Sequence, residues 1–189
     1  MAMRQQLDTD KVWDPIVRLT HGLLVVLFGV AYWLGGDWFG LHAQIGYSVA
    51  LLVVLRMLWG FVGPPHARFS EFVPTPRRLM AYIYSLCRGR AAEYRGHDPA
   101  GALMIIFLLL SLAVTTLSGM TLFAMEHRGP FAGTAMAKLP GSGVEAVHQF
   151  ASEATIVLAG LHVLGVLVMG RVHRQRLVRA MLTGRKWLR

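Results

Sequence analysis

Apolar residues occur along this chain in four long runs, which polar and glycine- or proline-rich segments separate. The runs cover about residues 15–34, 41–62, 100–125 and 144–170. A helix needs about 20 mostly apolar residues to cross the hydrocarbon core of a bilayer. The hydrophobic pattern therefore predicts an all-α integral membrane protein, a bundle of four spanning helices within a single membrane domain over residues 1–189.

Helix-capping and helix-breaking residues stand at the ends of these runs. Asp14-Pro15 and Asp98-Pro99 each combine an N-cap with proline at the first helical position, so they predict the starts of the first and third spans. Residues 35–37 and 63–65 are glycine- or proline-rich and end the first two spans, and residues 140–143 break the chain before the fourth. The first span is too long for a cleavable signal, so we expect it to remain on the protein.

The connection between the second and third spans contains a further helical pattern. Thr75-Pro76 precedes an apolar repeat in which Leu79, Tyr82, Ile83 and Leu86 share one face of a helix. With arginines nearby, such an amphipathic helix is typical of a segment lying flat on the cytoplasmic leaflet. The alternative is a short connecting helix in water.

Composition and charge agree with a membrane location and add an orientation. Of the residues, 54% are hydrophobic and 15% are charged, against about 25% charged in a soluble domain. Sixteen of the 19 basic residues fall in residues 1–18, 63–99 and 171–189, whereas the other two connections hold only Arg128 and Lys138. The positive-inside rule then places both termini and the 63–99 connection in the cytoplasm. The net charge of +9 is thus a topology signal rather than a nucleic-acid-binding surface.

The single cysteine, Cys87, limits the possible redox and metal chemistry. One cysteine excludes an internal disulfide, a four-cysteine zinc site and a cysteine-held iron–sulfur cluster. The chain has no CxxCH sequence, so haem cannot be attached covalently in the c-type manner. Histidine is therefore the metal ligand that the sequence offers.

Four of the eight histidines, His21, His42, His148 and His162, fall within the predicted spans. Ionisable residues at membrane depth are costly and mark functional sites. His21 lies about 9 Å from the cytoplasmic end of its span, and His42 opens the second span at the outer face. His162 follows His148 by a rise of about 21 Å on nearly the same helix face. The depths therefore pair His21 with His162 on the cytoplasmic side and His42 with His148 on the periplasmic side.

Two such pairs predict two non-covalent haem b groups, because each haem iron takes one imidazole on either side of the macrocycle. Facing helices of a bundle are where cofactor sites of this kind are built. Small residues accompany the histidines, namely Gly22, Gly29, Gly46, Gly160 and Gly165. They either give the macrocycle clearance or allow close packing of membrane helices.

Three charged residues within or beside the spans have two interpretations each. Arg56 and Arg18 either pair with haem propionates or extend toward the lipid headgroups. Glu153 either accepts a proton during quinol chemistry or stays protonated in a helix contact.

The chain resembles the bacterial cytochrome b561 and nickel–iron hydrogenase cytochrome b superfamily of four-helix dihaem cytochromes. The matching segments span residues 12–186, in the order VWDPIVRLTHG, LHAQIGY, LRMLWGFVGPPHARFSEFV, YRGHDPAG, VHQF, GLH and VRAMLTGRK. The axial histidines of the family fall on the four histidines that the depths select. Two positions depart from the family pattern, Gly22 where tryptophan is common and Gln149 where glutamate is common, and neither is a ligand.

Electron transfer follows as the expected function. The resemblance implies a multi-pass protein of the bacterial inner membrane that passes electrons between the quinone pool and a periplasmic partner, such as a c-type cytochrome or a hydrogenase. An alternative is a self-contained superoxide:quinone oxidoreductase of the cytochrome b561 type, for which Arg128, Lys138 and His127 are the only outer cations available. A haem-free transporter or membrane anchor is a third possibility, but broken spans at the midplane are missing from the pattern.

Overall fold

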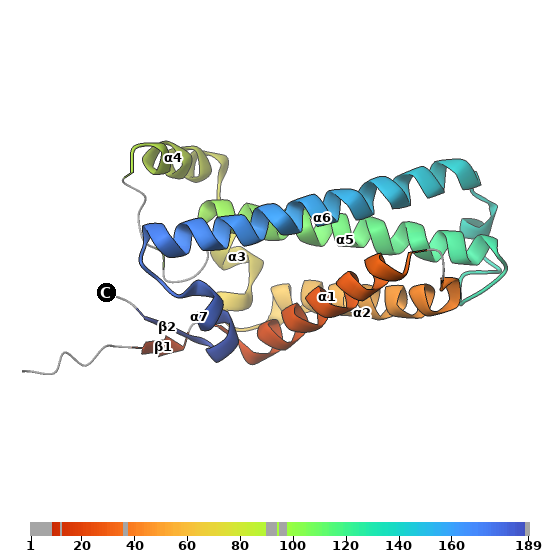
Figure 1. Ribbon diagram of the computed structural model, residues 1–189, viewed down its shortest axis with the longest axis horizontal. Coiled ribbons are helices and arrows are strands. Elements are labelled where there is room, and N and C mark those ends of the chain that lie inside the picture. The colour runs from red at the N-terminus through yellow and green to blue at the C-terminus, as the bar shows by residue number, and fades with distance from the viewer. Residues whose placement is uncertain (1–8, 12, 36–37, 90–93, 95–97, 188–189) are drawn as a thin grey trace, which may run out of the picture. The chain divides into compact units, whose positions relative to one another are not determined.

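The computed structural model describes residues 9–11, 13–35, 38–89, 94 and 98–187. Its four long helices are α1 (Pro15–Leu34), α2 (Phe39–Val62), α5 (Pro99–Met125) and α6 (Gly141–Val172) (Figure 1). All four are long and apolar enough to cross a membrane. The predicted all-α fold with four spans is confirmed, and the protein is a multi-pass membrane protein. Arg4, Gly36, Asp37, Arg90, Arg95 and Arg189, which the sequence interpretation used, lie outside the described residues.

The predicted caps are confirmed, and two helix starts differ from prediction. Asp14 Oδ1 accepts the backbone N–H groups two and three residues later, at 2.9 and 3.1 Å, and Asp98 Oδ1 does so at 3.1 and 2.9 Å. However, α2 begins two residues earlier than predicted, and α6 begins three residues earlier, at Gly141. Glycine costs a helix only about 1 kcal/mol relative to alanine, so the segment 141–143 can form the first turn of α6.

Shorter elements lie in the connections and near the C-terminus. They are η1 (Pro65–Ala67), α3 (Phe69–Phe72), α4 (Pro76–Cys87), η2 (Ala135–Lys138) and α7 (Leu177–Thr183). The helix predicted after Thr75 is α4, and the Thr75 hydroxyl caps it as expected. The sequence did not indicate α7, or the antiparallel pairing of β1 (Thr9–Lys11) with β2 (Arg185–Trp187).

The structure divides into two compact units, and each long helix contributes residues to both. The terminal unit comprises Met1–Leu19, Trp59–Met104 and Leu161–Arg189. The middle unit comprises Thr20–Leu58 and Ile105–Gly160.

In the terminal unit, the start of α1 is bound to the end of α7. The Arg18 guanidinium donates to the carbonyl oxygens of Met181, at 2.8 Å, and Leu182. Arginine commonly binds the unsatisfied carbonyls at a helix C-terminus in this way. Gly184 ends α7 with φ of 79°, and its carbonyl accepts the Trp13 N–H at 3.2 Å. The first span is thereby attached to residues more than 160 positions away in the chain.

In the middle unit, a small apolar core joins α1, α2 and α5. Val49 and Val53 of α2 and Leu112 of α5 are buried at its centre. Leu24, Leu27 and Phe28 of α1 pack against them. This core sets α1 and α2 beside the half of α5 that carries the polar contacts described next.

Hydroxyl groups connect α5 to α6 within the middle unit. Thr155 of α6 is 2% exposed, and its Oγ1 lies 2.7 Å from Ser111 Oγ and 3.5 Å from Thr115 Oγ1 of α5. Ser111 Oγ also donates to the Ala151 carbonyl at 3.2 Å. Within a bilayer the hydrophobic effect does not drive helices to associate, so interhelical hydrogen bonds of this kind help to hold the spans together.

Replacing Thr155 with valine should therefore weaken the α5–α6 contact. The shape is kept while the interhelical hydroxyl is lost, and the expected destabilisation is about 1 kcal/mol, within the range measured for such bonds in membranes. Thr116→Val is the matched control, because the buried Thr116 hydroxyl bonds only carbonyls of its own helix. Unfolding by sodium dodecyl sulfate titration measures both, and equal stability of the two variants would contradict an interhelical role.

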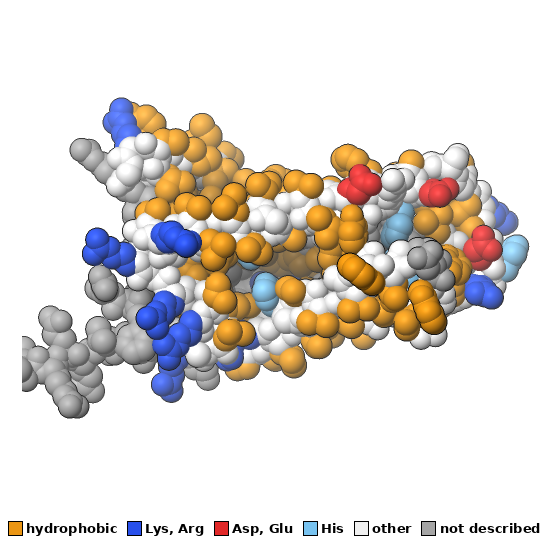
Figure 2. Space-filling view, in the orientation of Figure 1, with side chains coloured by type: hydrophobic (Ala, Val, Ile, Leu, Met, Phe, Trp, Pro, Cys, Tyr) orange, Lys and Arg blue, Asp and Glu red, His pale blue; other side chains and the backbone are white. Residues whose placement is uncertain are grey.

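The surface is largely apolar along the long helices. In an apolar 18-residue stretch of α6, only 6% of the residues are buried within the protein. An exposed apolar surface of this extent is typical of lipid contact. Figure 2 shows hydrophobic side chains along these helices, whereas the lysine and arginine side chains of the terminal unit gather over α4, α7 and the end of α6. Charge therefore concentrates at helix ends and connections.

Candidate functional site

Two of the four predicted ligand histidines face each other in the middle unit. His42 lies in the first turn of α2, and His148 lies in the second turn of α6. Their ring centroids are 6.1 Å apart, and the ring planes are inclined at 81°. Both side chains are partly buried. The two imidazoles that the sequence pairs by their depth in the spans are thus neighbours.

A backbone carbonyl fixes the tautomer of His42. Its Nδ1 lies 2.9 Å from the carbonyl oxygen of Ala31, near the end of α1. A carbonyl can only accept, so Nδ1 carries a proton, and in the neutral imidazole the lone pair is then on Nε2.

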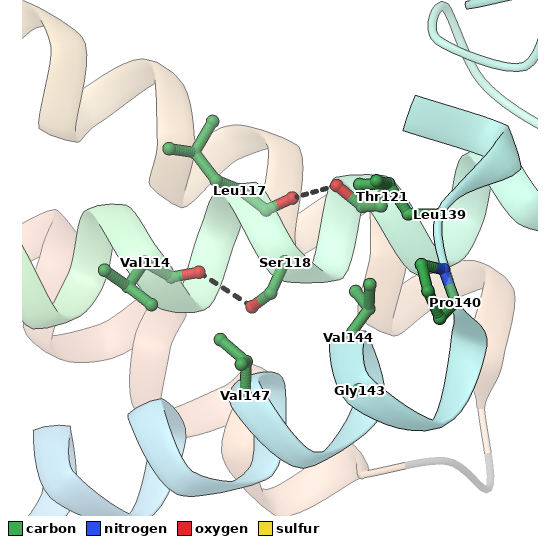
Figure 3. Close-up of a pocket in the computed structure, with 9 residues that line it drawn as sticks. All are labelled: Val114, Leu117, Ser118, Thr121, Leu139, Pro140, Gly143, Val144 and Val147. Atoms are coloured by element: carbon green, nitrogen blue, oxygen red, sulfur yellow. Dashed lines mark hydrogen bonds between the residues drawn. The ribbon is translucent and has the colours of Figure 1, made fainter. Parts of the chain in front are cut away.

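His148 is held in the same tautomer by two acceptors on α5. Its Nδ1 lies 2.9 Å from the Thr115 carbonyl oxygen and 3.2 Å from Ser118 Oγ. The Ser118 hydroxyl donates to the Val114 carbonyl at 2.7 Å, as Figure 3 shows, so its oxygen has only lone pairs to offer to the ring. Both neighbours of Nδ1 therefore accept, and the lone pair of His148 is again on Nε2.

Gly119 makes room for the His148 ring, and sequence reasoning missed it. A Cβ at Gly119 would lie 2.9 Å from His148 Cε1 and 3.2 Å from Nδ1, closer than side chains tolerate. The only sequence signal was a glycine inside a span, a common feature of membrane helices.

The glycines singled out from the sequence have open space beside them instead. A Cβ added at Gly22, Gly29, Gly46 or Gly160 in the middle unit, or at Gly165 in the terminal unit, would meet no atom within 4 Å. Close helix packing is therefore not what these five positions provide in the structure.

His21 and His162 belong to different units. His21 is exposed in the part of α1 that lies in the middle unit, whereas His162 is partly buried in the part of α6 that lies in the terminal unit. Their pairing stays a prediction from depth.

The charged candidates differ in their surroundings. Arg56 of α2 is only 7% exposed, so its side chain lies within the protein rather than extending to the lipid headgroups. Arg18 binds the end of α7, a role that neither interpretation of the sequence included. Glu153 is exposed and accepts a hydrogen bond from Gln149 Nε2 at 3.2 Å, so it forms a contact within its own helix.

A groove lies between α5 and α6, and Ser118, whose hydroxyl contacts His148, is one of its lining residues. It has a volume of about 380 Å³, and Ser118 and Thr121 are its polar lining residues (Figure 3). Both hydroxyls donate to carbonyls of their own helix, at 2.7 and 2.8 Å, so the groove wall is apolar. A second apolar groove continues past Val114 and Val147.

Comparison with known proteins assigns the chain to a family. The family model of prokaryotic cytochrome b561 matches residues 12–184. This chain belongs to the prokaryotic cytochrome b561 family. It is 24% identical over 164 residues to a probable Ni/Fe-hydrogenase B-type cytochrome subunit of Bradyrhizobium diazoefficiens. The aligned region covers 78% of this chain and 66% of the relative. It is also 30% identical over 91 residues to a probable Ni/Fe-hydrogenase B-type cytochrome subunit of Azotobacter vinelandii. That alignment covers 44% of this chain and 38% of the relative.

The chain thus spans just under two thirds of the length of the first curated relative and less of the second. No solved structure matches this cytochrome.

The residues of the middle unit fit the haem that the family name implies. Metal–imidazole bonds are about 2.0 Å long, so a metal between two rings separates their centres by about 6 Å, close to the observed 6.1 Å. Metal-binding histidines almost always donate their other ring N–H to a carbonyl or carboxylate, as His42 and His148 do. Among the described residues no group of three or more His, Cys, Asp or Glu gathers.

Proposed function

We propose that this cytochrome b561 is an electron-transfer subunit that carries electrons across the membrane between the quinone pool and a redox partner on the periplasmic side. Two b-type haems, bound without covalent attachment, would supply one-electron chemistry at their irons. The observation that carries the proposal is the His42–His148 pair, whose rings are 6.1 Å apart. Both rings are held with Nε2 available as a ligand.

The chain contributes ligands, orientation and exclusion of water. His42 and His148 would hold one haem, and His21 and His162 the other. Carbonyl acceptors on α1 and α5 orient the first pair and increase the basicity of its Nε2 atoms. Arg56, buried in α2, would pair with a propionate, because a guanidinium fork matches a carboxylate. Arg18, with two donors committed to α7, is a weaker candidate for the other propionates.

The orientation and partner follow from charge and from relatives. The basic segments support an orientation in the bacterial inner membrane with both termini in the cytoplasm, and in that orientation the His42–His148 end would face the periplasm. The relatives named as hydrogenase cytochrome subunits support a hydrogenase-like partner on that side. A periplasmic c-type cytochrome is the other partner that we consider.

Visible spectroscopy and quinol oxidation test this function. The protein purified in detergent should contain two haem b per chain, and decylubiquinol should reduce that haem. Absence of haem would leave a transporter or anchor as the function. Rapid quinone reduction driven by superoxide, without any partner, would instead indicate the self-contained superoxide:quinone oxidoreductase and overturn the role as a subunit.

A further inference from the structure

The helix α4 in the terminal unit presents apolar residues on two sides. One side packs inside the protein: Tyr82 is 3% exposed, and its ring lies 5.7 Å from the ring of Tyr94. Burial, with the Asp98 carboxylate as the second cause, raises the pKa of Tyr82. Leu79 and Leu86 are partly buried on this side. Most of the face that the sequence indicated for the membrane is therefore used within the terminal unit.

The other side of α4 carries a second apolar stripe that is exposed. Met80 is 65% exposed, Tyr84 is 58% exposed, and Ile83 and Cys87 are exposed as well. These residues stand at positions i, i+3, i+4 and i+7, the spacing that aligns side chains along one face of a helix. We call Met80, Ile83, Tyr84 and Cys87 the outer stripe.

Positive charge borders the outer stripe. Arg77 and Arg88 are exposed, and the Arg88 guanidinium lies 4.1 Å from the centre of the Tyr84 ring. Helical geometry places Arg77 next to Tyr84 around the helix. The sequence of α4 contains no aspartate or glutamate. Apolar residues on one face with arginines at its edge are typical of helices that lie in the interface of anionic membranes.

The connections keep α4 near a membrane surface. Thirteen residues separate the end of α2 from α4, and eleven separate α4 from the start of α5. Both neighbours are membrane-spanning helices, so α4 is tethered on the side of the membrane where the second span ends and the third begins. A lipid leaflet is thus within reach of the outer stripe, and its anionic headgroups complement the bordering arginines.

We propose that the outer stripe of α4 lies in the boundary between headgroups and acyl chains of that leaflet, with Arg77 and Arg88 bound to anionic phospholipid headgroups. The membrane is thereby contacted by the amphipathic helix in addition to the four spans. The proposal is independent of the electron-transfer function, since it concerns neither the histidines nor a redox partner.

The single cysteine provides the test. A bimane label on Cys87 reports on the outer stripe, in the full-length protein reconstituted in nanodiscs with equal parts of phosphatidylcholine and phosphatidylglycerol. The matched control carries Cys87→Ser and Ala81→Cys, because Ala81 is exposed on α4 outside the stripe. Lipids brominated on their acyl chains should quench the label at position 87 several-fold more than the label at position 81. Aqueous iodide should quench the label at position 81 more.

Three other outcomes would overturn the proposal. Equal iodide quenching at both positions would place the outer stripe in water. Protection of position 87 from both quenchers would indicate a protein partner or a second copy of the chain. Unchanged bromolipid quenching in discs of pure phosphatidylcholine, or in the Arg77→Gln, Arg88→Gln variant, would show that anionic headgroups are not what the arginines bind.

Discussion

Replacing His148 with alanine should lower the haem content from two groups per chain to one. The imidazole would be one of two axial ligands, and its loss leaves His42 alone with Nε2 as a ligand on one side. The haem count by the pyridine haemochrome method, with a reduced-minus-oxidised spectrum, measures the effect. His173→Ala is the matched control, because His173 follows the last turn of α6 and lies outside the predicted ligand set.

The double variant makes this prediction sharper. If His42 and His148 serve the same haem, then His42→Ala, His148→Ala and the double variant should each retain one haem, because the second loss removes nothing further. Residues that act as one unit show this non-additivity. A double variant without any haem would place the two histidines at different haems, and full haem content in the single variants would exclude both as ligands.

Substituting Gly119 should disturb the same haem without touching a ligand. A methyl group there would lie 2.9 Å from His148 Cε1, so the ring must move away from its acceptors, the Thr115 carbonyl and Ser118 Oγ. Overpacking of this kind costs about 1–3 kcal/mol. We expect Gly119→Ala to shift the midpoint potential and the low-spin electron paramagnetic resonance signal of one haem only, and Gly119→Val to lose that haem.

Gly143→Ala serves as the control for this substitution. Gly143 is also helical, and a Cβ there meets nothing within 4 Å. Both alanine substitutions therefore raise the helix propensity, but only Gly119→Ala produces a clash. If Gly119→Ala and Gly143→Ala gave identical potentials and spectra, Gly119 would have no positioning role.

Features set by local chemistry could be predicted from the sequence. The length of the apolar runs defined the four spans, and each Asp-Pro pair located a helix start through its carboxylate. Counting residues along the spans brought His42 and His148 to one level, which their 6.1 Å ring separation supports.

Features set by backbone atoms or distant contacts could not be predicted. The acceptors of the two imidazoles are the carbonyls of Ala31 and Thr115, and every residue has a carbonyl, so no sequence pattern marks them. Gly119 matters only because α6 brings a ring against it. The binding of Arg18 to Met181 joins residues 163 positions apart, and no periodicity reports such a contact.

Periodicity also could not tell what covers the apolar face of α4. The repeat selected the face with Leu79, Tyr82 and Leu86, which the structure packs inside the protein, and a repeat does not distinguish protein from lipid as the covering material. Packing of Tyr82 against Tyr94 shows that protein covers this face.

The contacts of Arg18 and Trp13 with the end of α7 impose an order on biosynthesis. Ribosomes make α1 first, and α7 and β2 emerge only after all four spans have been translated. The hydrogen bonds from Arg18 to Met181 and from Trp13 to Gly184 can therefore form only after the four spans have been made. The start of α1 can bond Trp59 of α2 as soon as the second span is made, but its contacts with α7 form only after residue 177 has been translated. A chain truncated before α7 would therefore lack one of the two sets of contacts that hold the N-terminal end of the first span.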